Sequence, residues 1–115
     1  MDAREFERQV DGVIRSVRNQ LDGGWARGAR YGKEGPCLVG AIDAVTSWTI
    51  PGVRGQVQRE LVACLPRTYG LIARVRPRLA LALYNDLGSQ SRSRDLAWRA
   101  QLEREVEREA LVIVA

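Results

Sequence analysis

Apolar residues recur every three or four positions along much of the chain, which is the spacing of one face of an α-helix. The clearest case is residues 3–21, whose apolar positions are Phe6, Val10, Val13, Ile14, Val17 and Leu21. Arg and Glu occupy most of the remaining positions, and the sequence Asp22-Gly23-Gly24 ends the segment. The pattern predicts a first helix that buries one side against a core.

Two further helices are predicted in the middle of the chain. Pro36 favours the first turn of a helix that reaches about residue 49. The apolar positions of this second helix are Leu38, Ala41, Ile42, Val45 and Trp48. The spacing therefore predicts that Trp48 is buried. After a Pro-Gly turn, the apolar positions of residues 53–65 predict a third helix.

The second half of the chain is less regular. Pro77 interrupts the helical spacing within residues 67–88, because proline lacks an amide donor and clashes with the preceding turn. After a polar loop, a last helix is predicted with an apolar side made of Leu96, Ala97, Ala100, Leu102, Val106 and Ala110. The charges at 103–109 are interpreted as a solvated face with ion pairs at i, i+4. The apolar tail 111–115 is interpreted as either a short strand or a docking segment.

These elements predict a mainly α fold, in which residues 1–115 form a single domain. The expected architecture is an irregular bundle of four or five helices. Residues 25–35 contain three glycines and are unsuited to a stable helix, which leaves room for one small β-hairpin or strand pair. With 45% hydrophobic residues in 115, the chain can bury a core without disulfides or bound metal.

The composition excludes several classes of enzyme. The chain has no histidine, so it cannot form a Ser-His-Asp or Cys-His arrangement or a His-ligated zinc site. Cys37 and Cys64 form no CxxC motif. Cys37 is interpreted as a small buried residue rather than a thiolate activated by a helix N-terminus. We therefore predict that the protein is not an enzyme, with no catalytic residue, no metal and no cofactor.

The expected compartment is the cytoplasm. The charged N-terminal segment lacks the apolar core of a signal peptide. No apolar run approaches the roughly 18 to 20 residues that cross a bilayer. A small secreted domain would usually contain more cysteine than this chain does. We expect no membrane partner.

The charge balance suggests nucleic acid as an alternative partner. The formal net charge is +4, and all but one of the eighteen basic residues are arginine. A candidate basic face for phosphate groups consists of Arg74, Arg76, Arg78, Arg92, Arg94 and Arg99. The competing interpretation is an ordinary solvated surface that pairs with the acidic first and last helices.

Three residues are candidates for a ligand or partner site: Trp25, Asn85 and Asp86. Asn85 and Asp86 form a polar pair at the end of an apolar segment. The favoured interpretation is structural, with Asn85 as a helix C-cap and Asp86 as an acceptor for turn amides or for an arginine such as Arg27 or Arg30. An enzymatic site would require both residues to share one pocket with Cys37.

Three features resemble a family of small proteins of unknown function from actinobacteria and their bacteriophages. They are Trp25 after a glycine turn, the Cys-Leu-x-Gly-Ala segment at 37–41, and the Asn-Asp pair at 85–86. Tyr84 stands where the family has Trp. The resemblance covers about residues 10–110. It implies a host or phage cytoplasm and some role for Asn85 and Asp86, but it implies no activity.

We therefore expect a non-enzymatic accessory protein, phage-encoded if the resemblance holds, that acts by binding a host protein. The absence of catalytic groups and the charged, amphipathic outer helices support this expectation. The alternative is a nucleic-acid-binding regulator that uses the Arg-rich segment 67–99. Homo-oligomer formation stays open for either function.

Overall fold

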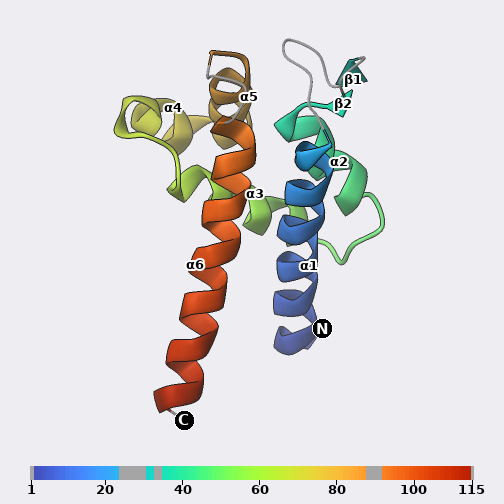
Figure 1. The fold of residues 1–115 in the computed structure, drawn as a ribbon, viewed down its shortest axis with the longest axis vertical. Coiled ribbons are helices and arrows are strands. Elements are labelled where there is room, and N and C mark those ends of the chain that lie inside the picture. The colour runs from blue at the N-terminus through green and yellow to red at the C-terminus, as the bar shows by residue number, and fades with distance from the viewer. Residues whose placement is uncertain (1, 24–30, 33–34, 88–91, 115) are drawn as a thin grey trace.

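The computed structural model describes residues 2–23, 31–32, 35–87 and 92–114 (Figure 1). Within these ranges the chain forms six α-helices, one 3-10 helix and a pair of short strands. The helices are α1 (Ala3–Asp22), α2 (Leu38–Thr46), α3 (Val53–Ala63), η1 (Arg67–Tyr69), α4 (Gly70–Val75), α5 (Pro77–Leu87) and α6 (Arg92–Val114). The strands β1 (Tyr31–Gly32) and β2 (Gly35–Pro36) pair in antiparallel register. The fold is mainly helical, as predicted, but its α-helices number six rather than four or five.

The two longest helices, α1 and α6, lie side by side and run in opposite directions (Figure 1). The start of α1 and the end of α6 consequently lie at the same end of the molecule (Figure 1). α2 and α3 pack against α1, and α5 packs against α2 and α3. α4 packs mainly on α5 and η1, and it stands out at the edge of the molecule (Figure 1).

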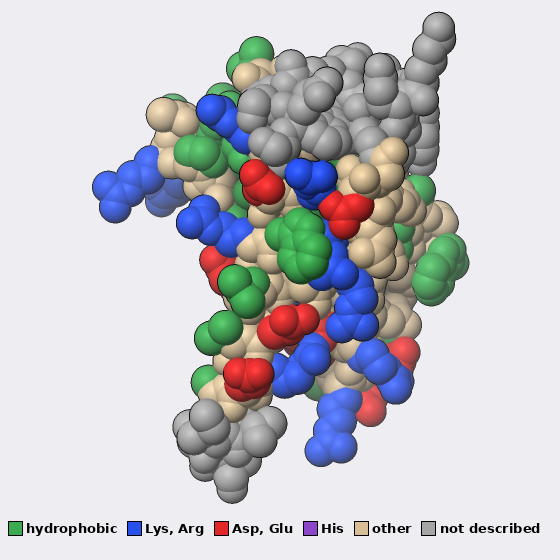
Figure 2. Space-filling view, in the orientation of Figure 1, with side chains coloured by type: hydrophobic (Ala, Val, Ile, Leu, Met, Phe, Trp, Pro, Cys, Tyr) green, Lys and Arg blue, Asp and Glu red, His purple; other side chains and the backbone are tan. Residues whose placement is uncertain are grey.

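The apolar face predicted for α1 is buried from Val10 onwards, and Phe6 is partly buried against the same core. Asp2 accepts the backbone N–H of Arg4 at 2.9 Å, which caps the start of the helix. The predicted apolar face is buried at Val10, Val13, Ile14, Val17 and Leu21. Figure 2 shows charged side chains of both signs over the face of the molecule formed by α1 and α6.

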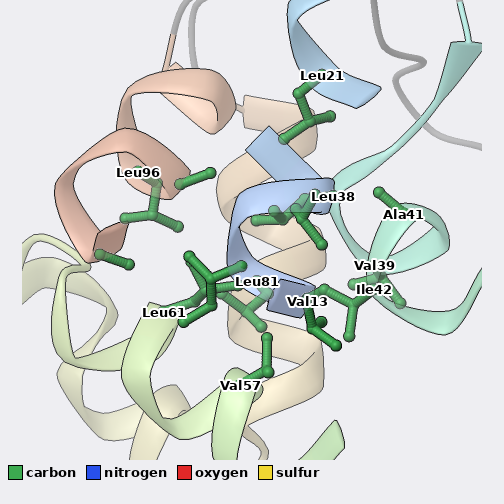
Figure 3. Packing of buried hydrophobic residues seen from close by; sticks show 14 of the residues in the cluster. Val13, Leu21, Leu38, Val39, Ala41, Ile42, Val57, Leu61, Leu81 and Leu96 are labelled. Carbon is green, nitrogen blue, oxygen red and sulfur yellow. The ribbon is translucent and has the colours of Figure 1, made fainter. Parts of the chain in front are cut away.

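The core lies where the helices meet (Figure 3). Leu38 and Ile42 of α2, Leu61 of α3 and Leu81 of α5 are completely buried and pack around α1. Burying a side chain of this size contributes about 1.5–3 kcal/mol relative to leaving it in water. Leu96 of α6 joins the same cluster, so one core connects the first helix with the last.

The prediction for Trp48 is wrong, because its side chain is 76% exposed. α2 ends at Thr46, two residues before the tryptophan. Hydroxyl groups bond to backbone carbonyls at this end: Thr46 Oγ1 donates to Ile42 O, and Ser47 Oγ donates to Ala44 O. Such local bonds compete with helix continuation. Trp48 therefore leaves the helical spacing that would have directed it inward.

The prediction for the last helix is also partly wrong. The buried face of α6 consists of Ser93, Leu96, Ala97, Ala100, Gln101 and Arg104. Leu102, Val106 and Ala110, which were predicted on the apolar side, are exposed instead. The tail is not a strand, since α6 continues to Val114.

Candidate functional site

Asn85 forms a polar junction between three helices. Its side chain is almost fully buried, near the end of α5. The Oδ1 atom accepts the backbone N–H of Leu38 at 3.1 Å and the hydroxyl of Ser93 at 2.9 Å. The Nδ2 group donates to Asp86 Oδ1 at 3.2 Å. The C-cap interpretation of Asn85 is therefore wrong: the residue joins α5 to the start of α2 and to α6.

Cys37 lies at the same junction. Its Sγ accepts the N–H of Gly40 at 3.2 Å, in the position of an N-cap for α2. Together, Cys37 and Asn85 satisfy two backbone donors that a helix start leaves without intrahelical partners. The buried position of Cys37 agrees with its structural interpretation.

The structure thus brings together two of the three groups that an enzymatic site would need. Cys37 and Asn85 meet at the start of α2, but both side chains hold backbone amides there. Asp86 is next in sequence and exposed. Trp25, Arg27 and Arg30 lie outside the described residues. The geometry indicates a structural junction.

Cys64 is held as a neutral thiol. Its Sγ donates to Glu60 O and to Glu103 Oε2, both at 3.5 Å. Burial and the neighbouring Glu103 carboxylate raise the pKa of Cys64 to about 11. Since thiolates rather than thiols are nucleophilic, Cys64 is unreactive near neutral pH.

The predicted basic face is divided by ion pairs. Arg78 forms a bidentate pair with Asp43 of α2, with N···O distances of 2.8 and 2.5 Å. This hydrogen-bonded carboxylate raises the pKa of Arg78. Arg94 lies 3.6 Å from Asp22 of α1. Two of the six arginines are therefore already paired within the chain.

The other four arginines are exposed at two places. Arg74 and Arg76 lie at the junction of α4 and α5, whereas Arg92 and Arg99 lie on α6. Residues 61–85 contain no acidic residue, so the positive charge near α4 has no compensating charge along the chain.

Among the described residues, a cluster of charged side chains surrounds Arg104, and the sequence analysis did not predict it. Arg104 has only 8% of its side chain exposed, and it bonds to three carboxylates. Its Nε donates to Asp11 and its Nη2 to Glu7, both at 2.6 Å, while Nη1 donates to Glu60. These four residues, the Arg104 cluster, join α6 to α1 and α3. The interpretation of residues 103–109 as a wholly solvated face is wrong at this position.

Glu60 occupies an unusual place in the Arg104 cluster. Burial raises its pKa by more than the Arg104 charge lowers it. Its Oε2 atom is buried and has no hydrogen-bond partner within the described part of the chain. The ion pair and the raised pKa are compatible, because only one carboxylate oxygen faces the guanidinium.

Three residues of the cluster, Arg104, Glu7 and Asp11, line an open groove between α1 and α6, with a volume of about 750 Å³. The groove is lined by Arg4, Glu7, Arg8, Asp11, Gly12, Arg15, Arg104, Glu107 and Arg108. Arg108 also pairs with Asp11 across this groove. The sequence does contain one indication that this side of α6 is buried. Positions 93, 97, 100 and 104 share one side of the helix and carry small or polar residues.

Large apolar side chains are exposed at two further places. On α4, Leu71 and Val75 are 77% and 74% exposed, and no residue of this helix is buried. On α6, Trp98, Leu102 and Val106 are 48%, 59% and 58% exposed. Contiguous exposed apolar groups mark interaction surfaces in soluble proteins.

Comparisons with protein-family models, with curated proteins and with solved structures find no match. The resemblance to the actinobacterial and phage family therefore stays a prediction. No helix among the described residues is long and apolar enough to cross a membrane. Over the same residues, no group of three or more Cys, Asp and Glu side chains is arranged to hold a metal ion.

Proposed function

We propose that this chain is a non-catalytic cytoplasmic accessory protein that binds a partner protein through its α4 corner, residues 67–79. The observation that carries the proposal is the exposure of Leu71 and Val75 on a helix without a buried residue. These residues are four apart, so they share one side of α4. Leu79, at the start of α5, adds a third exposed apolar group.

Two local features position the corner relative to α5. Arg76 has an extended conformation (φ −139°, ψ 82°) before Pro77, which fixes the break between α4 and α5. Tyr69 of η1 packs edge-to-face on Tyr84 of α5, with ring centroids 5.6 Å apart. A preorganised surface binds with a smaller loss of conformational entropy.

The charges around the corner indicate the chemistry of the partner. Arg67, Arg74 and Arg76 are exposed, and no acidic residue lies between positions 61 and 85. The complementary surface of the partner has an apolar pocket for these side chains and carboxylates around it. Opposite charges at the rim of an interface guide association. The sequence resemblance adds the expectation that the partner belongs to an actinobacterial host.

Site-specific photocrosslinking tests this proposal. The photoreactive residue replaces Leu71 in one protein (Leu71→benzoylphenylalanine) and Trp48 in a matched control, since both side chains are strongly exposed. In nuclease-treated actinobacterial lysate, we expect a discrete adduct from position 71 that Val75→Gln abolishes. No adduct at position 71, or the same adduct from position 48, contradicts the proposal.

The second candidate function is nucleic-acid binding, and one observation favours it. The uncompensated arginines of the α4 corner include Arg74 and Arg76, which lie close together and are exposed. Binding of this kind weakens steeply with salt, and it would be abolished by Arg74→Glu together with Arg76→Glu. Leu71→Gln would leave it intact. The apolar content of the corner makes this function the weaker candidate, since phosphate groups offer nothing for Leu71 and Val75 to pack against.

A further inference from the structure

The outward face of α6 carries an apolar stripe with an acidic border. The α6 stripe consists of Trp98, Leu102 and Val106, which are spaced four residues apart and point away from the buried side of the helix. Glu105 and Glu109 each follow a stripe residue by three positions, so they border the stripe along one side. Both glutamates are exposed.

The neighbouring α1 presents the opposite charge. Arg4, Arg8 and Arg15, the α1 ridge, are exposed and lie at spacings of four and seven, which places them on one side of the helix. Within the described residues, Arg4 and Arg15 have no carboxylate partner. Arg8 pairs only with Glu5, one turn away on the same exposed surface. Such surface pairs are weak and exchange readily.

Both charged borders are visible on one face of the molecule. Figure 2 shows basic side chains gathered over the lower part of α1, with acidic and apolar side chains along α6 beside them. One face of this chain therefore carries the α6 stripe, its acidic border and the α1 ridge.

We infer that this face binds the same face of a second copy of the chain. The two copies associate about a two-fold axis parallel to α1 and α6, so that each α6 lies over α1 of the other copy. A two-fold interface uses one surface patch twice, and it requires a patch that is complementary to itself. Here the acidic border of each α6 meets the α1 ridge of the other copy, and the α6 stripes are buried between them.

Contacts within one copy set the register of this pairing. Asp11 lies level with Arg104, and Arg18 lies level with Trp98, stacked at 3.9 Å from its ring centroid. A two-fold axis parallel to the helices keeps every residue at its own level. Arg8 is three residues before Asp11, so it lies level with position 107. It consequently faces Glu105 and Glu109 of the other copy.

The alternative occupants fit this face less well. A nucleic acid would place phosphates above Glu7 and Asp11 in the groove and would leave Leu102 and Val106 without apolar contacts. An unrelated protein would need to reproduce a charge pattern that the chain already supplies. The dimer uses α1 and α6 only, so it does not depend on the partner proposed for the α4 corner.

Sedimentation velocity of the full chain is the first test. We expect a species of twice the 12.8 kDa monomer mass at low salt, with a monomer fraction that grows as salt screens the charge pairs. The variant Trp98→Ala with Leu102→Ala keeps the buried face of α6 and should be monomeric. A wild-type chain that stays monomeric at every protein concentration and salt overturns the proposal.

Charge reversal tests the register. One variant carries Arg4→Glu and Arg8→Glu, and the other carries Glu105→Arg and Glu109→Arg. Each should be a folded monomer alone, as judged by circular dichroism, because like charges then face each other in both halves of the interface. An equimolar mixture should form a heterodimer, since both halves become complementary again.

The matched control is Arg67→Glu with Arg74→Glu, which changes the net charge by the same amount at the α4 corner. This variant should still dimerise. If the two reversed variants fail to associate when mixed, or if the control also dissociates, the proposed pairing is wrong.

Discussion

The first and last helices of this protein follow different rules of burial. In α1, the large apolar side chains predict the buried face correctly, from Val10 to Leu21. In α6, the large apolar side chains Leu102 and Val106 are exposed, and the buried side is made of small and polar residues. Apolar size predicts the buried face only where the helix packs against an apolar surface.

The neighbours of α6 explain this difference. Ala97 and Ala100 allow α6 to lie close to the helices that it crosses, and there the core is apolar. Further along, Asp11 of α1 and Glu60 of α3 leave an acidic site that only a basic side chain can fill. Arg104 fills it. The inward direction of this half of α6 is therefore set by charge.

The largest loss in the free energy of unfolding is expected when the charge of Arg104 is removed. Arg104→Met keeps the length of the side chain but leaves three carboxylates without their guanidinium. Breaking a buried ion pair by removing one partner costs about 3–5 kcal/mol. Urea unfolding followed by circular dichroism measures the loss. Arg108→Met is the control: it removes a neighbouring cation that is about half exposed, and the expected loss is below about 1 kcal/mol. Equal losses would show that the cluster does not orient α6.

A comparison of leucines tests the same difference with neutral side chains. Leu21→Ala in α1 should lower the free energy of unfolding by about 2–5 kcal/mol, because it removes a fully buried side chain and leaves a cavity. Leu102→Ala in α6 should change it by less than about 0.5 kcal/mol. Both variants are measured by urea unfolding below the concentration at which the chain associates. A large loss for Leu102→Ala would place that residue in the core.

This contrast also separates what the sequence predicts from what it does not. The helical class, the buried face of α1 and the break at Pro77 follow from spacing and from proline geometry. The exposure of Trp48 could not be predicted, because it depends on hydroxyl-to-carbonyl bonds that end α2 early. The roles of Asn85 and Arg104 depend on partners 47 and 93 residues away, Leu38 and Asp11, which local patterns do not reveal.

Substitutions at the polar start of α6 are expected to lower the free energy of unfolding by less than the loss of Arg104 does. Asn85→Ala removes the acceptor of the Leu38 N–H and the Ser93 hydroxyl, and leaving buried donors unsatisfied costs about 1–3 kcal/mol. Ser93→Ala removes one hydrogen bond and should cost about 1 kcal/mol. A double-mutant cycle by urea unfolding should give losses that do not add, because the two side chains share a bond. Additive losses would mean that the Asn85–Ser93 bond contributes nothing.

The smallest expected effect is the contribution of Glu60, in the Arg104 cluster, to the pH dependence of the free energy of unfolding. Burial raises the pKa of Glu60 above its ordinary value of 4.5. A raised pKa in the folded state means that the folded protein holds this proton more tightly than the unfolded chain does. Stability from Glu60 is therefore complete below about pH 4.5, and it is lost as the pH rises through the folded-state pKa.

Glu60→Gln removes this titration and retains an oxygen that can accept from Arg104. The difference in unfolding free energy, variant minus wild type, should increase as the pH rises from about 4.5. The remaining carboxylates titrate in both proteins, so their contributions largely cancel in that difference. A difference that decreases with pH would show that the Arg104 charge outweighs burial at Glu60.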